Sequence, residues 1–122
     1  MEYDEVSEGI IGCAIEVHRT LGPGLLESVY EKAFALEMSR NGICYECQKS
    51  LPVLYKNEPV GQFRVDLVVE GLVVVELKSV ERLDPIFEAQ LLTYMKLGGY
   101  KLGLLLNFNS RLLNDGIKRM IL

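Results

Sequence analysis

The sequence predicts a mixed α/β fold in which helices pack against a single β-sheet. Apolar residues recur at helical spacing over residues 6–38, and residues 43–80 then change to alternating β-branched and aromatic residues. Asp84-Pro85 marks the start of another helix. The 122 residues, of which 49% are hydrophobic, match one globular domain with a proper core. We therefore expect a single domain over residues 1–122.

Two helices are predicted at the beginning of the chain. The first runs from about Val6 to Leu21, where Gly22-Pro23-Gly24 interrupts the pattern. The second ends at Asn41-Gly42, because glycine readily adopts the left-handed conformation that often follows a helix. Their apolar stripes comprise Val6, Ile10, Cys13, Ala14, Val17 and Leu21, and then Leu26, Val29, Tyr30, Ala33, Phe34 and Met38.

Three strands of an antiparallel meander are expected next, at residues 43–55, 60–69 and 72–80. Turns at residues 56–59 and from Glu70-Gly71 join them. A helix then runs from Asp84-Pro85 to Gly98-Gly99, and Tyr100–Asn107 forms a fourth, buried strand. The pattern leaves open the type of the closing element, Leu112–Leu122. The expected element order is α-α-β-β-β-α-β-(α), with the final helix optional.

Composition excludes several classes of protein. Thirteen Lys and Arg against 17 Asp and Glu give a net charge of −4, which argues against binding nucleic acid through bulk charge alone. No apolar run approaches the roughly 18 residues needed to span a membrane. The acidic N-terminus also lacks the features of a secretory signal. We therefore expect a cytoplasmic protein that does not bind membranes.

The cysteines predict neither a disulfide framework nor a zinc site. Cys44 and Cys47 form a single C-x-x-C pair, and the chain offers no second pair of ligands. In a strand, residues three apart also point to opposite faces. We interpret this pair as buried thiols.

The central hairpin combines an apolar face with a face that is charged at one end. The apolar face is expected to lie against a helix. Its members are Val65, Leu67, Val69, Val73, Val75 and Leu77. The opposite face carries Arg64, Asp66, Glu76 and Lys78 at one end. Glu76 and Lys78 project side by side because they are two residues apart on a strand.

The register of this hairpin decides whether Asp66 lies beside Glu76. A two-residue turn at Glu70-Gly71 would place Asp66 opposite Val75, on the wrong face. A three-residue turn that includes Leu72 places Asp66 opposite Glu76. We predict the three-residue turn, because only this register keeps the apolar residues of both strands on one buried side.

The same register places Arg64 opposite Lys78. Asp66 and Glu76 would then be close enough to bind a hard divalent cation, with Lys78 free to meet a water or an oxyanion. The alternative is an ordinary Glu76–Lys78 ion pair at a solvated sheet edge. Spacing alone favours the ion pair, because charged pairs on strands are common.

Three motifs resemble those of the PD-(D/E)XK nuclease superfamily. Asp66, followed by Glu76-Leu77-Lys78 on the next strand, resembles its D…(D/E)-x-K signature, although Val65 replaces the proline. Residues 90–94, QLLTY, are similar to the Q-x-x-x-Y motif of RecB-like nucleases. Residues 24–30, GLLESVY, resemble the G-x-x-E-x-x-Y motif of a family of small prokaryotic proteins in this superfamily. The resemblance implies a restriction-endonuclease-like mixed sheet.

The resemblance also implies roles at a metal centre. Asp66 and Glu76 would bind Mg²⁺ or Mn²⁺ with the help of the Leu77 carbonyl. Lys78 would orient the attacking water or stabilise the phosphorane. Glu27 would be a further catalytic acid and metal ligand from the second helix; its alternative role is to complement the helix dipole.

Other residues are expected around this centre. Gln90 and Tyr94 share one helix face, from which they could reach the substrate, or instead satisfy buried polar groups beside the core. The candidates for substrate binding are Gln90, Tyr94, Arg64 and Tyr30. His18 corresponds to a metal-binding histidine that some RecB-like nucleases place ahead of the carboxylates. Its alternative is a solvated histidine at a helix C-terminus.

These implications favour a metal-dependent nuclease that hydrolyses phosphodiester bonds of nucleic acid, with DNA as the expected substrate. The acidic charge balance favours a homodimer or a larger complex over a monomer that binds tightly to a specific sequence. The alternative is a catalytically idle module of the same fold that binds nucleic acid or a protein partner.

Overall fold

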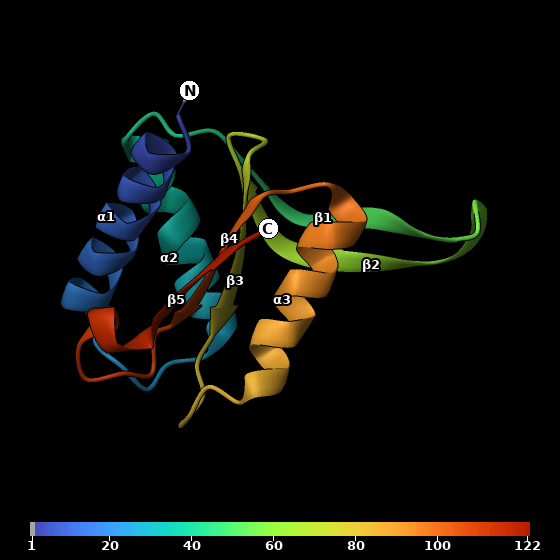
Figure 1. The fold of residues 1–122 in the computed structure, drawn as a ribbon. Coiled ribbons are helices and arrows are strands. Elements are labelled where there is room, and N and C mark those ends of the chain that lie inside the picture. The colour runs from blue at the N-terminus through green and yellow to red at the C-terminus, as the bar shows by residue number, and fades with distance from the viewer. Residues whose placement is uncertain (1) are drawn as a thin grey trace.

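A five-stranded mixed sheet with helices on both faces forms the centre of the computed structural model, which describes residues 2–122 (Figure 1). The strands lie in the order β1-β2-β3-β4-β5; β3 and β4 are parallel, and the other neighbours are antiparallel. The predicted α/β class is confirmed, as is the element order as far as β4. The elements are α1 (Tyr3–Leu21), α2 (Glu27–Arg40), β1 (Tyr45–Tyr55), β2 (Glu58–Val69), β3 (Val73–Lys78), α3 (Pro85–Gly98), β4 (Leu102–Asn107), a 3₁₀ helix (Leu113–Gly116) and β5 (Ile117–Ile121).

The closing element is a strand rather than the optional helix of the predicted order. After the short 3₁₀ helix, β5 pairs antiparallel with β4, from Leu106↔Ile117 to Leu102↔Ile121. All six residues of β4 are buried. A buried strand must satisfy its backbone N–H and C=O groups, and β5 satisfies those along the edge that β3 does not cover.

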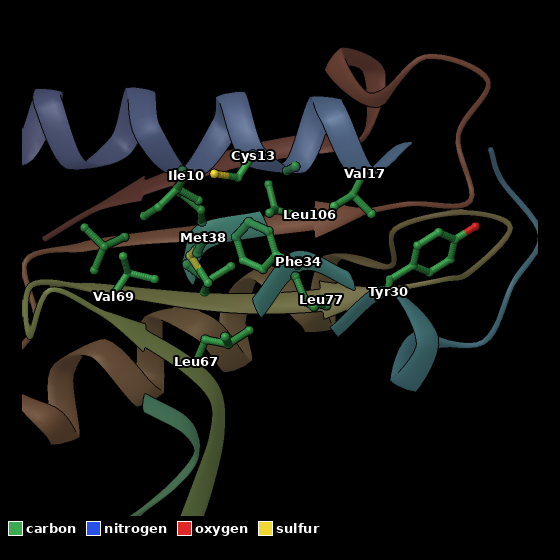
Figure 2. Close-up of a cluster of buried hydrophobic side chains, with 14 of the residues drawn as sticks. Ile10, Cys13, Val17, Tyr30, Phe34, Met38, Leu67, Val69, Leu77 and Leu106 are labelled. Carbon is green, nitrogen blue, oxygen red and sulfur yellow. The ribbon is translucent and has the colours of Figure 1, made fainter. Parts of the chain in front are cut away.

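The sheet has an apolar layer on each face. On the α1 and α2 side, Figure 2 shows Ile10, Cys13, Val17, Tyr30, Phe34 and Met38 of the helices meeting Leu67, Val69, Leu77 and Leu106 of the strands. On the other face, Leu91 and Met95 of α3 pack against strand residues. Gly103 permits this close approach, because a Cβ atom there would lie 2.6 Å from the Met95 sulfur. Both faces of the central strands are therefore covered.

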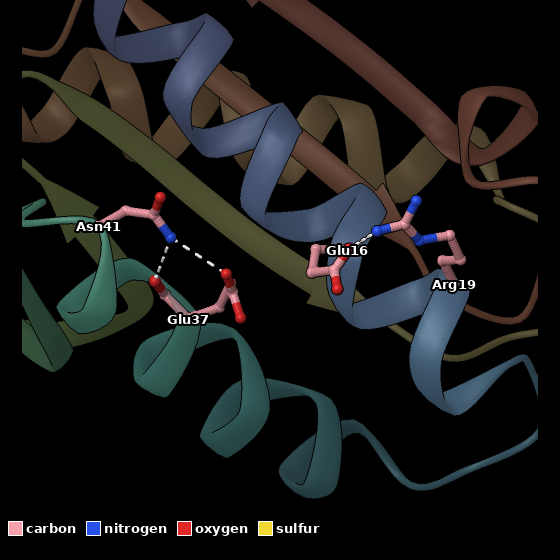
Figure 3. Close-up of polar contacts among 4 residues, drawn as sticks. All are labelled: Glu16, Arg19, Glu37 and Asn41. Carbon is pink, nitrogen blue, oxygen red and sulfur yellow. Dashed lines mark hydrogen bonds and ion pairs between the residues drawn. The ribbon is translucent and has the colours of Figure 1, made fainter.

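The ends of the helices are fixed by the residues that the sequence indicates. The Asp84 carboxylate accepts a hydrogen bond at 2.9 Å from the backbone N–H two residues on, and Gly99 is left-handed after α3. Gly42 is left-handed after α2, where the Asn41 amide donates to the backbone carbonyl and the carboxylate of Glu37 (Figure 3). No helix within residues 2–122 has the length and apolar character to cross a membrane.

The central hairpin has the predicted register. Val69 pairs with Val73 and Leu67 with Val75, so the turn contains three residues, 70–72. Its first two residues, Glu70 and Gly71, are left-handed, with φ of 54° and 66°.

Beyond Leu67 the hairpin departs from the prediction, because β2 and β3 diverge. Asp66 and Glu76 occupy the next position of the register but do not form a backbone pair. The predicted pairing of Arg64 with Lys78 is absent, and Arg64 lies opposite Ser50 of β1 instead. The strands therefore separate at the two candidate metal ligands.

Val65 does not lie on the predicted face. The other five members of the apolar face pack against α1 and α2, whereas Val65 packs in the α3 layer. Gln48 of β1, which lies opposite Asp66, has no backbone partner and has a φ of 51°. The regular alternation of β2 is therefore interrupted at Asp66, and this interruption transfers Val65 to the other side of the sheet.

The prediction that Cys44 and Cys47 are buried is wrong. Cys13, on the buried face of α1, is not exposed, but both thiols of the C-x-x-C pair are exposed. Cys44 precedes β1, and Cys47 lies within β1 at the edge of the sheet. An edge strand has a neighbour on one side only, which leaves its side chains less covered.

Candidate active site

The loop before α2 is held against the end of β3. The buried Tyr30 hydroxyl donates to the carbonyl of Gly22 and accepts from the backbone N–H of Leu25 at 3.1 Å. The Ser79 hydroxyl, just after β3, donates to the Leu25 carbonyl at 2.5 Å. Gly24, with a φ of 97°, has the conformation that favours glycine. Glu27, the first residue of α2, is thereby placed beside β3.

Tyr30 is therefore an anchor of this loop, and its position does not favour the predicted contact with substrate. Its side chain is 0% exposed. The ring stacks on Phe108, with 4.6 Å between the ring centres, and both hydrogen-bonding capacities of the hydroxyl are used within the loop. A substrate cannot reach a side chain that is enclosed in this way.

Glu27 and Asp66 line the same cavity, as the sequence predicts, but Glu76 and Lys78 are not among its lining residues. We call it the acidic cavity; its lining residues are Glu27, Ser28, Glu31, Gln48, Asp66 and Leu77. Three of these residues carry carboxylates, two from α2 and one from β2. Its volume of about 160 Å³ has room for a cation with water ligands.

Asp66 links the strands at the point where they diverge. Its Oδ2 accepts a hydrogen bond of 2.8 Å from the backbone N–H of Leu77. Its Oδ1 accepts from the side-chain amide of Gln48 at 3.4 Å. Each carboxylate oxygen can accept more than one bond, so the group keeps acceptor capacity for a cation.

Glu76 is a buried carboxyl group that lacks a hydrogen-bond partner for one oxygen. The residue is 6% exposed, and within residues 2–122 nothing donates to its Oε1. Burial raises the pKa of Glu76 to about 9, the hydrogen bond and charge of Asp66 add to this, and the Lys78 ammonium opposes it. Without a cation, Glu76 is therefore protonated near neutral pH.

The alternative of an ordinary Glu76–Lys78 ion pair at a solvated edge is wrong. Glu76 belongs to β3, which has neighbours on both sides, and it takes part in no ion pair within the described residues. The Lys78 Nζ instead lies 4.4 Å from the centre of the Phe87 ring. Its ammonium is thus held by a cation–π contact close enough to affect Glu76.

Of the two residues predicted on α3, Tyr94 is close enough to Glu76 and Asp66 for their charges to affect its pKa. Burial raises the pKa of Tyr94, and the negative charges of Glu76 and Asp66 raise it further. Its ring stacks on Phe63 of β2 at 4.8 Å between centres. Gln90, one turn earlier on the same helix face, is exposed.

Two other predicted residues lie away from the acidic cavity. Arg64 is exposed on the β1–β2 hairpin. His18 lines a different cavity, and its Nε2 lies 2.7 Å from the carbonyl oxygen of Ser110. At 8% exposure His18 is also not the solvated histidine of the alternative, because the loop after β4 covers the end of α1.

The structure adds two residues that the sequence analysis missed. Glu31 lies one helical turn after Glu27; burial raises its pKa, the charges of Asp66 and Glu27 act in the same direction, and a hydrogen bond from Gln48 opposes them. The amide of Gln48 donates to Glu31 at 2.6 Å. The four-residue spacing from Glu27 could have indicated Glu31. No pattern in the sequence indicated Gln48.

These donors suit a hard divalent cation with few protein ligands. A buried carboxylate oxygen without a partner, beside a second carboxylate, is the kind of ligand that Mg²⁺ prefers. Within the described residues, no three or more His, Cys, Asp or Glu side chains are arranged to hold a metal. Mg²⁺ commonly uses one or two carboxylates and completes its coordination with water and phosphate oxygens, so two protein carboxylates are sufficient.

Comparison with known protein families identifies the superfamily of the chain. The family model of the PD-(D/E)XK nuclease superfamily matches residues 4–120. The chain therefore belongs to this superfamily, and its five-stranded mixed sheet is consistent with the restriction-endonuclease-like fold. Membership indicates a nuclease that binds nucleic acid, and enzymes of this superfamily generally use divalent metal ions. No curated protein and no solved structure matches the chain significantly.

Proposed function

We propose that the protein is a metal-dependent nuclease that cleaves DNA. Asp66 and Glu76, with the backbone carbonyl of Leu77, would hold Mg²⁺ or Mn²⁺. The main support is the buried Glu76 oxygen that has no donor and lies beside Asp66. When bound, such a cation supplies a Lewis acid that lowers the pKa of water and polarises the phosphodiester.

Lys78 and Glu27 act on the reacting groups. The Lys78 ammonium has three donors and no lone pair, so it orients water or stabilises negative charge on the phosphate and does not bind the cation. The Phe87 ring limits the positions that this ammonium can occupy. Glu27 enters the acidic cavity from the start of α2 and serves as the further acid.

The substrate approaches from the α3 side and the hairpin. Gln90 is exposed one turn from Tyr94, whose pKa the charges of the carboxyl pair affect, so this helix face can contact the nucleic-acid backbone or a base. Arg64 offers a cation on β2. A net charge of −4 gives little general attraction for DNA, so the active unit is a homodimer or a larger complex.

The chain belongs, in this proposal, to the GxxExxY branch of the superfamily. Each named residue of that motif has a separate physical role here. Gly24 adopts the left-handed turn, Glu27 lines the acidic cavity, and Tyr30 anchors the loop. A motif in which every residue has such a role is unlike a chance match.

A cleavage assay tests the proposal directly. The protein is incubated with single- and double-stranded DNA and RNA in Mg²⁺, in Mn²⁺ and in excess chelator, and calorimetry measures Mn²⁺ binding. We expect cleavage of DNA only with metal, and binding of Mn²⁺ without substrate. A protein that binds no Mn²⁺ and cleaves none of the four substrates would contradict the proposal and favour the idle interaction module.

A further inference from the structure

Gln48 combines an unusual backbone with contacts to two acids of the cavity. Its φ of 51° lies in the left-handed region, which costs energy for any residue with a Cβ atom. Cys47 pairs with Leu67 and Lys49 with Val65, but Gln48 has no partner between them. Interruptions of this kind redirect a side chain, and they are common beside active sites.

The redirected side chain joins the helix to the strand. Gln48 Nε2 lies 2.6 Å from Glu31 Oε1 and 3.4 Å from Asp66 Oδ1. An amide nitrogen has two N–H donors, and an ionised carboxylate can only accept. One amide therefore bridges an acid of α2 and an acid of β2, which would otherwise repel each other.

With the Gln48 amide, both oxygens of the Asp66 carboxylate accept a hydrogen bond. The backbone N–H of Leu77 holds one carboxylate oxygen from β3, and Gln48 holds the other from β1. Two donors on different strands fix the rotation of the carboxylate. A ligand whose orientation is fixed in advance binds a cation more tightly than one that must be ordered during binding.

We propose that Gln48 is a positioning residue that orients Asp66 and draws Glu31 towards the cation site. This inference rests on the proposed nuclease function, since it concerns the same cation. Gln48 acts through Asp66 and Glu31 and does not touch the reacting atoms. A structural role alone does not account for the strain, because Gln48 is exposed and glycine would adopt the same backbone without it.

Metal binding by the whole protein tests the role of the amide. We expect Gln48→Leu, which keeps the size of the side chain but removes its donors, to weaken Mn²⁺ binding by about tenfold or more in calorimetry. Cleavage by this variant should be slow at low Mn²⁺ and should recover as Mn²⁺ approaches saturation. The recovery follows because excess cation compensates for a poorly oriented ligand.

Two further variants separate the amide from the backbone. Gln62→Leu is the matched control: Gln62 is exposed on the hairpin, where it accepts a hydrogen bond from Ser50, and its loss should leave Mn²⁺ binding unchanged. Gln48→Gly adopts positive φ without strain but has no amide, and it should bind Mn²⁺ as weakly as Gln48→Leu.

The outcomes distinguish this inference from the proposed function. If wild type binds Mn²⁺ and Gln48→Leu binds it equally well, the positioning role is wrong while the nuclease proposal stands. Wild-type affinity in Gln48→Gly would likewise overturn the role of the amide, because only the backbone would matter. If wild type binds no Mn²⁺, both proposals fail.

Discussion

Two buried polar side chains near the ends of neighbouring parallel strands differ in what surrounds them. Asn107 closes β4 and is 4% exposed; its Oδ1 accepts from the backbone N–H groups of Val80 and Asn109, and its Nδ2 donates to the Val80 carbonyl. Glu76, on β3, is 6% exposed and has one oxygen without any donor.

The two side chains are similarly buried but differ in whether their hydrogen bonds are made. Burial of a polar group is costly unless its hydrogen bonds are made, and Asn107 makes them with the loops that follow β3 and β4. At Glu76 no hydrogen bond from residues 2–122 to Oε1 offsets this cost, which a leucine at the same position would not incur. The comparison indicates that Asn107 stabilises the fold, and it supports the proposed role of Glu76 as a cation ligand.

The largest expected effects are on cleavage. We expect Lys78→Ala to lower cleavage about a thousandfold while Mn²⁺ binding stays close to wild type, since the ammonium acts on water and phosphate. Glu76→Ala should lose both cleavage and Mn²⁺ binding. The control is Lys118→Ala, an exposed lysine on β5. Equal loss of Mn²⁺ affinity in Lys78→Ala and Glu76→Ala, measured by calorimetry, would contradict this division of roles.

The next largest effect concerns the stability of the satisfied residue. Asn107→Leu leaves two partly buried N–H groups and one carbonyl without partners, so we expect the free energy of unfolding to fall by about 3 kcal/mol. Asn41→Ala is the comparison at the surface, where water replaces the lost bonds (Figure 3). It should cost less than about 1 kcal/mol in urea unfolding. Similar losses in the two variants would show that burial does not decide the role of Asn107.

A more gradual effect is the pH dependence of stability in chelator. The pKa of Glu76 rises from an ordinary 4.5 to about 9 on folding, so the folded state holds a proton that the unfolded state releases between these values. Stability should therefore decline as pH rises from 5 to 8, with Glu76 contributing up to about 1.4 kcal/mol per pH unit. Glu76→Gln should remove this contribution. Parallel pH profiles for the two proteins would exclude a raised pKa at Glu76.

Much of the fold could be predicted because local signals determine it. Asp84-Pro85 and Gly99 set the ends of α3, and the length of the turn from Glu70 placed Asp66 level with Glu76. The face of Val65 could not be predicted, since it depends on a backbone irregularity in another strand. The sequence pattern also did not predict the closing strand β5, because its pairing with β4 is a tertiary contact.

The candidate site shows the same limit. The motif identified Asp66, Glu76 and Lys78 along the chain, and the structure brings Glu27 to Asp66. Tyr30 and Glu27 belong to one motif, yet one is an enclosed anchor and the other lines the cavity. Gln48 has a positive φ, and a glutamine in the sequence gives no indication of such a backbone conformation. Sequence patterns thus indicated Asp66, Glu76 and Glu27 as candidates, but neither Glu31 nor Gln48.

Thermal melts of wild type and Glu76→Gln at pH 7.5 test most directly whether Glu76 is retained for a cation. In chelator the variant should melt higher than wild type, because glutamine needs no proton when buried beside Asp66. Mn²⁺ at a hundredfold excess over its dissociation constant should stabilise wild type by about 2.7 kcal/mol and leave the variant nearly unchanged. Glu58→Gln, the same change at an exposed position of β2, should behave as wild type. A wild type indifferent to Mn²⁺ and Mg²⁺, with Glu76→Gln melting at the same or a lower temperature, would contradict the account.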